Sequence, residues 1–170
     1  MAGTLSVSRS SFYWYFEDLD ELRSELVDIW HRNTASIVER SRRESATPVA
    51  ACLGVFECWA DQSLFDARLD LAMRHWGRRR PDVAERVALA DQERLEAIES
   101  MFARHGFRRD DSVVRARLLY HSQVGYFALD TNEPIETRLT YLPYYLEAMT
   151  GTRPTDQELT AFTEFVAALG

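Results

Sequence analysis

Lysine is absent from the sequence, and all 20 of its basic residues are arginine. We interpret this absence as a compositional habit rather than as a functional feature. Aspartate and glutamate together number 27, so the formal net charge is −7. A protein that binds nucleic acid or an anionic membrane over its whole surface needs a basic face. The charge therefore excludes such a binder, although it does not exclude a local basic site.

Glycine and proline are also scarce, at seven and five residues. Strand-rich folds need more turn residues than this, so the composition favours helices. No apolar run approaches the roughly 18 residues of a membrane span. The N-terminus has no basic flank followed by an apolar run, which a signal peptide would show. We therefore expect a cytoplasmic protein with no membrane partner.

Cysteine and histidine are few. Cys52 and Cys58 are six residues apart, which on a helix directs them to different sides, so we expect reduced thiols rather than a disulfide or a shared metal. The four histidines are scattered and form no His-Glu-x-x-His motif. The sequence also has no Gly-x-Ser-x-Gly elbow, phosphate loop or dinucleotide fingerprint. These absences predict a protein that is not an enzyme and that uses no metal or cofactor.

Helix caps, prolines and glycines recur along the whole chain, and no segment alternates apolar and polar residues as a strand does. The pattern predicts an all-α protein of about eight helices. The longest is expected to run over residues 18–43. Its expected apolar face consists of Leu19, Leu22, Leu26, Ile29 and Ile37. The other helices are expected at residues 9–15, 48–62, 65–78, 81–105, 111–130, 134–150 and 156–169.

Residues 5–22 read Leu-Ser-Val-Ser-Arg-Ser-Ser-Phe-Tyr-Trp-Tyr-Phe-Glu-Asp-Leu-Asp-Glu-Leu. The short helix in this segment begins with small polar residues and an arginine, which can approach base edges and phosphates. It ends in aromatic residues, of which Phe12, Trp14 and Phe16 are expected to anchor it to neighbouring helices. By chemistry alone the segment fits a recognition helix for DNA and an aromatic helix of a protein core equally well.

This run resembles the signature of the tetracycline-repressor (TetR) family of transcriptional regulators, at the second helix of its helix-turn-helix. The expected long connecting helix and helical bundle agree with the resemblance, as does the segment 118–126, Leu-Leu-Tyr-His-Ser-Gln-Val-Gly-Tyr. It implies that two tyrosines touch DNA phosphates and that the polar start of the helix faces the major groove. The implied DNA-binding set is Ser8, Arg9, Ser10, Ser11, Tyr13 and Tyr15.

Two features depart from the family pattern. Leu19 stands where the family commonly has a lysine on a phosphate, which lowers the expected DNA affinity by about one phosphate contact. The family also has about two further helices before this motif, whereas residues 1–5 can supply only the tail of one. We expect either a true start upstream of Met1 or a loss of DNA binding. We expect residues 1–170 alone to bind specific DNA weakly or not at all.

The resemblance divides the chain into residues 1–44, a partial helix-turn-helix domain with its connecting helix, and residues 45–170, a ligand-binding and dimerisation domain. It implies a ligand-responsive transcriptional regulator, by family default a repressor. Such a protein binds double-stranded operator DNA as a homodimer, provided that the further N-terminal helices are present. The alternative is an orphan dimeric sensor or interaction module that has lost DNA binding.

Aromatic and thioether side chains of the second domain are candidates for a pocket that takes a small hydrophobic or aromatic effector. At helical spacing, each of them is also a candidate for the core. The set is Phe56, Trp59, Met73, Trp76, Phe102, Tyr120, His121, Tyr141, Tyr144 and Tyr145. His121 and Gln123 are polar exceptions on an apolar helix, and His121 is open to a core, interface or ligand role.

The expected helix over residues 111–130 is apolar on two sides, which suits a subunit interface. We expect this helix and the one over residues 156–169 to pair with their two-fold mates in a four-helix bundle. Asp91 lies on the apolar side of its own expected helix. It is therefore either a buried partner for an arginine or a residue at the edge of the apolar stripe.

Overall fold

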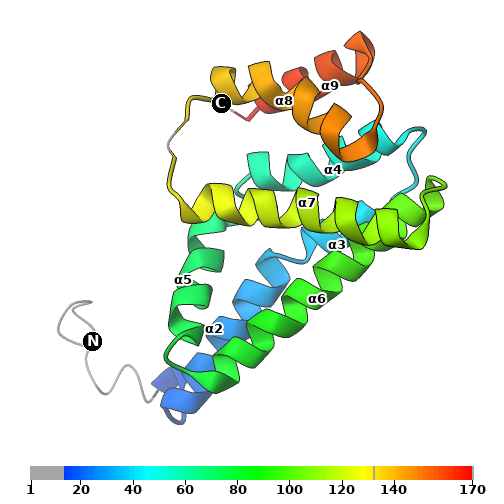
Figure 1. Cartoon of the computed structure of the whole chain (residues 1–170). Helices are drawn as coiled ribbons and strands as arrows, with labels where there is room; N and C mark the ends of the chain where they lie inside the picture. The colour runs from blue at the N-terminus through cyan, green and yellow to red at the C-terminus, as the bar shows by residue number, and fades with distance from the viewer. Residues whose placement is uncertain (1–13, 132, 170) are drawn as a thin grey trace.

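The computed structural model describes residues 14–131 and 133–169 (Figure 1). This part of the chain is helical and contains no strand, so the predicted all-α class is confirmed. The helices are α2 (Leu19–Asn33), α3 (Ser36–Arg42), α4 (Pro48–Ala60), α5 (Ala67–Gly77), α6 (Pro81–Arg104), α7 (Arg109–Ala128), α8 (Ile135–Thr150) and α9 (Asp156–Ala167). None of the described helices is long and apolar enough to cross a membrane.

Several helix ends follow directly from local sequence. The hydroxyl of Thr47 caps the first turn of α4 over 2.9 Å, and Pro48 occupies the first helical position, where a missing N–H costs nothing. Thr155 and Glu158 form the predicted capping box of α9. Gly151 ends α8 at a φ of 73°, a left-handed conformation that glycine adopts without steric penalty.

The prediction of one helix over residues 18–43 is wrong, because the chain breaks between α2 and α3 at residues 34–35. Two side chains at the break are used in long-range hydrogen bonds. Arg94 donates to the hydroxyl of Thr34 over 2.5 Å, and the side-chain oxygen of Asn33 accepts from the N-cap N–H of α5 over 2.9 Å. Since asparagine and threonine are weak helix formers, these tertiary bonds override the helical pattern.

The expected apolar face of α2 is also wrong in part. Leu19, Leu26 and Ile29 are exposed, whereas Val27 and Trp30 are buried. Helices α5 and α6 pack against α2 on this second side. The indole of Trp30 brings the largest apolar area of the helix, and its N–H donates to a buried carboxylate of α5 over 3.0 Å.

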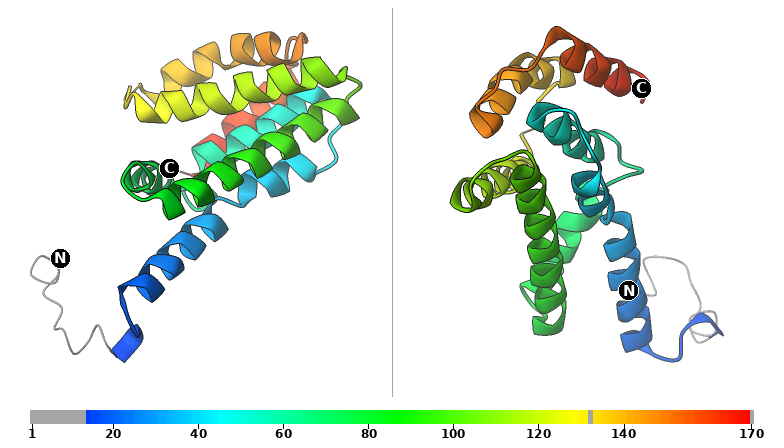
Figure 2. Two further views of the ribbon diagram at one scale, coloured as in Figure 1. Left: turned by 60° about the horizontal axis from the view of Figure 1, so that its bottom comes forward. Right: turned by 90° about the vertical axis from the view of Figure 1, so that its right-hand side faces the viewer.

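Two apolar clusters fill the interior, and α6 contributes to both. The larger cluster lies among α3, α4, α6, α7, α8 and α9, and the smaller one lies among α2, α5 and α6. Helices α8 and α9 form the end of the molecule opposite the N-terminal end of α2, which projects from the body (Figures 1 and 2). The fold therefore separates any site among α4, α7, α8 and α9 from the N-terminal end of α2.

Candidate ligand-binding site

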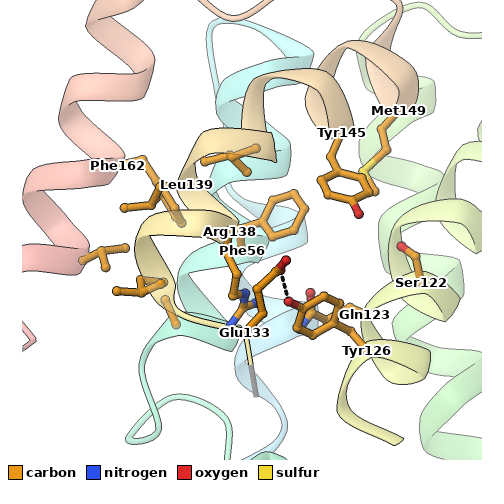
Figure 3. A pocket seen from close by; sticks show the side chains of 14 residues that line it. Phe56, Ser122, Gln123, Tyr126, Glu133, Arg138, Leu139, Tyr145, Met149 and Phe162 are labelled. Atoms are coloured by element: carbon orange, nitrogen blue, oxygen red, sulfur yellow. Dashed lines mark hydrogen bonds between the residues drawn. The ribbon is translucent and has the colours of Figure 1, made fainter. Parts of the chain in front are cut away.

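A cavity of about 120 Å³ lies between α4, α7, α8 and α9 (Figure 3), and α8 and α9 form the end of the molecule opposite the N-terminal end of α2 (Figure 1). Its walls are mostly apolar, because each of the four helices turns part of its core-facing stripe toward it. The apolar lining consists of Phe56, Ala60, Ile135, Leu139, Leu142, Met149, Phe162 and Val166, together with Tyr145.

Polar side chains are concentrated on one side of this cavity. The hydroxyl of Tyr126 donates a hydrogen bond to the carboxylate of Glu133. The guanidinium carbon of Arg138 lies 4.8 Å from the centre of the Tyr126 ring. Burial and the neighbouring Glu133 carboxylate raise the pKa of Tyr126, so its hydroxyl keeps its proton at neutral pH. Figure 3 shows these side chains and Gln123 lying together.

The side-chain amide nitrogen of Gln123 has no hydrogen-bond partner among the described residues. Its side chain lines the cavity, the residue is only 6% exposed, and its Nε2 is buried without a hydrogen-bond partner among the described residues. The described chain has one further atom in this condition, the hydroxyl oxygen of Ser41 in α3. An unpaired buried amide costs about 1–3 kcal/mol. A ligand that supplied an acceptor would therefore recover part of the lost hydrogen bonding.

Two of the aromatic residues expected around an effector, Phe56 and Tyr145, line this cavity. Trp59 and Phe102 belong instead to the larger apolar cluster and are 6% and 0% exposed. Phe56 and Trp59 are in edge-to-face contact, with ring centres 5.5 Å apart, so Trp59 supports the cavity wall from behind. The sequence pattern located this helix at the cavity but did not distinguish its lining residues from its core residues.

The remaining expected residues lie away from the cavity. Met73 and Trp76 pack in the smaller apolar cluster beside α2. Tyr141 and Tyr144 are exposed on the outer side of α8, and His121 is exposed on α7. The core role considered for His121 is therefore excluded. Periodicity identifies a residue as part of a stripe, but only the packing of neighbouring helices decides what covers the stripe.

Tyr120 is buried in a group of polar side chains, which we call the Arg94 cluster, and does not line the cavity. Its members are Asp70, Arg74, Asp91, Arg94 and Tyr120. Asp91 receives two hydrogen bonds from Arg74, each of 2.7 Å, and one of 2.7 Å from the Tyr120 hydroxyl. Of the two alternatives left open for Asp91, the arginine partner is the one observed, although the residue is partly buried rather than fully buried.

The Arg94 cluster is electrically balanced, with two carboxylates and two guanidinium groups. Burial alone would raise the pKa of Asp91, but the hydrogen bonds from Arg74 and Tyr120 and the charges of both arginines outweigh burial, so this pKa is lowered. Burial raises the pKa of Tyr120. None of the cluster's buried side-chain polar atoms is left without a partner. We therefore interpret the cluster as a joint between helices rather than as a binding site.

Of the expected DNA-binding residues, Tyr15 falls within the described part of the chain. Tyr15 is 70% exposed, and its ring meets the edge of Trp14 with centres 5.3 Å apart. Trp14 is 81% exposed, in agreement with the expectation that this chain lacks part of the surface against which the aromatic residues of the motif would pack. The other expected positions lie outside the described residues: Ser8, Arg9, Ser10, Ser11 and Tyr13.

Sequence reasoning missed the charged part of the cavity. Glu133 and Arg138 flank the start of α8, where charged residues ordinarily indicate a solvated turn. Gln123 had been singled out as a polar exception on an apolar helix, without a role. A polar residue on the buried side of a helix was therefore the one sequence signal that pointed to the polar side of the cavity.

Comparison of the chain with models of protein families, with curated proteins and with solved structures gave no match. The resemblance of residues 5–22 to a repressor signature therefore rests on that motif. Among the described residues, no group of three or more histidine, cysteine, aspartate or glutamate side chains is arranged to hold a metal ion.

Proposed function

We propose that this chain is the sensing and dimerisation part of a ligand-responsive transcriptional regulator. The observation that carries the proposal is the buried amide nitrogen of Gln123, which has no hydrogen-bond partner among the described residues and belongs to a side chain that lines a mostly apolar cavity. Buried polar groups without a hydrogen-bond partner are rare in folded proteins. A ligand that accepts a hydrogen bond from this nitrogen would satisfy it, which supports a ligand-binding role for the cavity. The DNA-binding half of the proposal is supported by the motif in residues 5–22.

Helix α7 offers a physical route from the cavity to the N-terminal part of the chain. Gln123 lines the cavity, while Tyr120, one turn earlier, contacts Arg94 over 2.9 Å. Arg94 in turn contacts Thr34 at the end of α2 and lies over the ring of Trp30, 5.3 Å from its centre. A ligand that binds one position of α7 better than another would shift the population of α2 orientations.

The exposed side of α7 supports the homodimer in this proposal. Val114 and Leu118 of α7 are 64% and 44% exposed, Leu129 directly after the helix is 76% exposed, and His121 is exposed on α7 as well. Pairing of α7 and α9 with their two-fold mates covers such a face and places two copies of the N-terminal segment symmetrically. A dimer of this kind reads two DNA half-sites about one or more helical turns apart.

In vitro selection from a pool of randomised duplexes tests the regulator. The protein is expressed from its natural reading frame, including any codons upstream of Met1 that continue the frame. We expect enrichment of a two-fold symmetric sequence whose binding weakens as the salt concentration rises. If no sequence is enriched while the protein is dimeric, the regulator proposal fails and a dimeric sensor without DNA binding takes its place.

A further inference from the structure

The charged groups at the cavity constrain the kind of molecule that it accepts. Glu133 and Arg138 both line the cavity, so its polar side carries one negative and one positive charge. The carboxylate of Glu133 is held by the Tyr126 hydroxyl, and Arg138 forms no salt bridge within the described chain. The polar side of the cavity therefore carries no net charge, and a charged ligand is attracted by one of these two groups and repelled by the other, so the site gives an ion no net electrostatic advantage.

The amide of Gln123 favours a ligand that carries a neutral hydrogen-bond acceptor over a ligand that carries a charge. Its Nε2 is a buried donor without a partner among the described residues, and it belongs to a side chain that lines a mainly apolar cavity. A neutral acceptor oxygen, such as a carbonyl, accepts from this donor and brings little desolvation cost of its own. A hydrocarbon of the same shape leaves the amide unsatisfied.

The volume of the cavity limits the size of the apolar part of a ligand that it can enclose. An apolar cavity of about 150 Å³ in another protein binds benzene, and the present cavity has a volume of about 120 Å³. The enclosed portion of a ligand is thus comparable to a single ring or a short branched chain. Phe56, Leu142 and Phe162 provide the surfaces against which such a group packs.

We propose that the cavity binds a neutral, ring-sized apolar molecule whose carbonyl oxygen accepts a hydrogen bond from the amide of Gln123. This inference rests on the sensing role given above and names the class of ligand. It does not depend on DNA binding. Its test can therefore be carried out on the chain alone, and it can fail independently of the regulator proposal.

The test compares four fluorinated probes of similar size by ¹⁹F NMR titration. They are 4′-fluoroacetophenone, 4-fluoroethylbenzene, 4-fluorobenzoate and 4-fluorobenzylammonium, which are a ketone, a hydrocarbon, an anion and a cation. We expect the ketone to bind about three- to tenfold more tightly than each of the other probes, the range given by one net hydrogen bond. Equal binding of ketone and hydrocarbon, preference for either ion, or no binding of the ketone overturns the proposal.

Gln123→Leu removes the amide and keeps the approximate shape of the side chain. The variant should bind the ketone only as tightly as the hydrocarbon, whose own affinity is retained. Its melting temperature should equal or exceed that of the wild type, because an unsatisfied buried amide is replaced by an apolar group. Gln157→Leu, at an exposed position of α9 away from the cavity, is the matched control and should keep the ketone preference.

Two further variants test the exclusion of charge. Glu133→Gln leaves Arg138 as the single charge on the cavity wall, so 4-fluorobenzoate should gain affinity. Arg138→Gln leaves Glu133, so 4-fluorobenzylammonium should gain affinity. If Gln123→Leu retains the ketone preference, or if both charge variants leave the ion affinities unchanged, the assigned ligand class is wrong. Enrichment of an operator sequence is a separate readout that these outcomes do not affect.

Discussion

The guanidinium of Arg94 donates a hydrogen bond to the hydroxyl of Tyr120 over 2.9 Å and so joins α6 to α7 inside the molecule. Arg94 is only 2% exposed, and its other partners include Thr34 at the break between α2 and α3 and the carboxylate of Asp70. One side chain thus connects four parts of the fold. The structure accommodates the buried charge of Arg94 because two carboxylates and two guanidinium groups neutralise and hydrogen-bond one another, with Arg94 and Asp70 buried and Arg74 and Asp91 partly buried.

Replacement of Arg94 by methionine should lower the free energy of unfolding by about 3 kcal/mol or more, since it leaves buried carboxylate without its full complement of donors. Urea denaturation measures the change. Arg86→Met, also in α6, is the control, because Arg86 forms a solvent-exposed pair with Asp28 at 3.4 Å and should contribute less than about 1 kcal/mol. Similar losses in both variants would contradict a special role for the buried cluster.

The lowered pKa of Asp91 predicts a pH dependence of stability. In the unfolded chain an aspartate has a pKa of about 3.9, so Asp91 favours the folded state fully above that pH. This contribution is lost as the pH falls through the lower pKa of the folded state. Urea denaturation at successive pH values should show a shallower acid slope for Asp91→Asn than for the wild type.

Asp91→Asn should also be less stable than the wild type at neutral pH, because the two hydrogen bonds from Arg74 to the Asp91 carboxylate lose their charge assistance. Glu44→Gln, at an exposed loop position, serves as the control and should keep the wild-type slope. An unchanged acid slope in Asp91→Asn would mean that other carboxylates govern acid unfolding.

Neither cysteine should react readily in the folded protein. Burial raises the pKa of Cys52 to about 12, against a smaller opposing effect of Arg115, and burial also raises the pKa of Cys58. Both thiols are therefore protonated at pH values near neutrality, and thiolate is the reactive form. Ellman's reagent should label them slowly in native buffer and rapidly in urea. Fast labelling without denaturant would show that α4 opens to solvent.

The proposed homodimer predicts that a charge on the exposed side of α7 produces monomers. Leu118→Arg places a guanidinium in the proposed interface, where it cannot be solvated. Light scattering at micromolar concentration should give twice the 19.7 kDa chain mass for the wild type and the single-chain mass for the variant. Leu89→Arg, at a 50% exposed position of α6, should remain dimeric. A monomeric wild type would contradict the proposed dimer.

The sequence by itself determined where most helices begin and end. Thr47 with Pro48, Gly151, and Thr155 with Glu158 act through hydrogen bonds and backbone preferences within one helical turn, so they are legible without knowledge of the rest of the chain. For the same reason the all-α class and the approximate bounds of α4 to α9 followed from local pattern.

Only the tertiary structure decided which residues meet. Phe56 was expected to line a ligand pocket from its position on a helix. The sequence assigned no role to Gln123, whose buried amide nitrogen is left without a hydrogen-bond partner by the packing of α4, α8 and α9 around the cavity. The break at Thr34 likewise depended on Arg94, which lies 60 residues further along the chain. Burial and hydrogen-bond satisfaction depend on neighbours that are distant in sequence. The periodicity of the sequence therefore predicts which side of a helix is apolar, whereas only the packing of the helices determines which residues that side contacts.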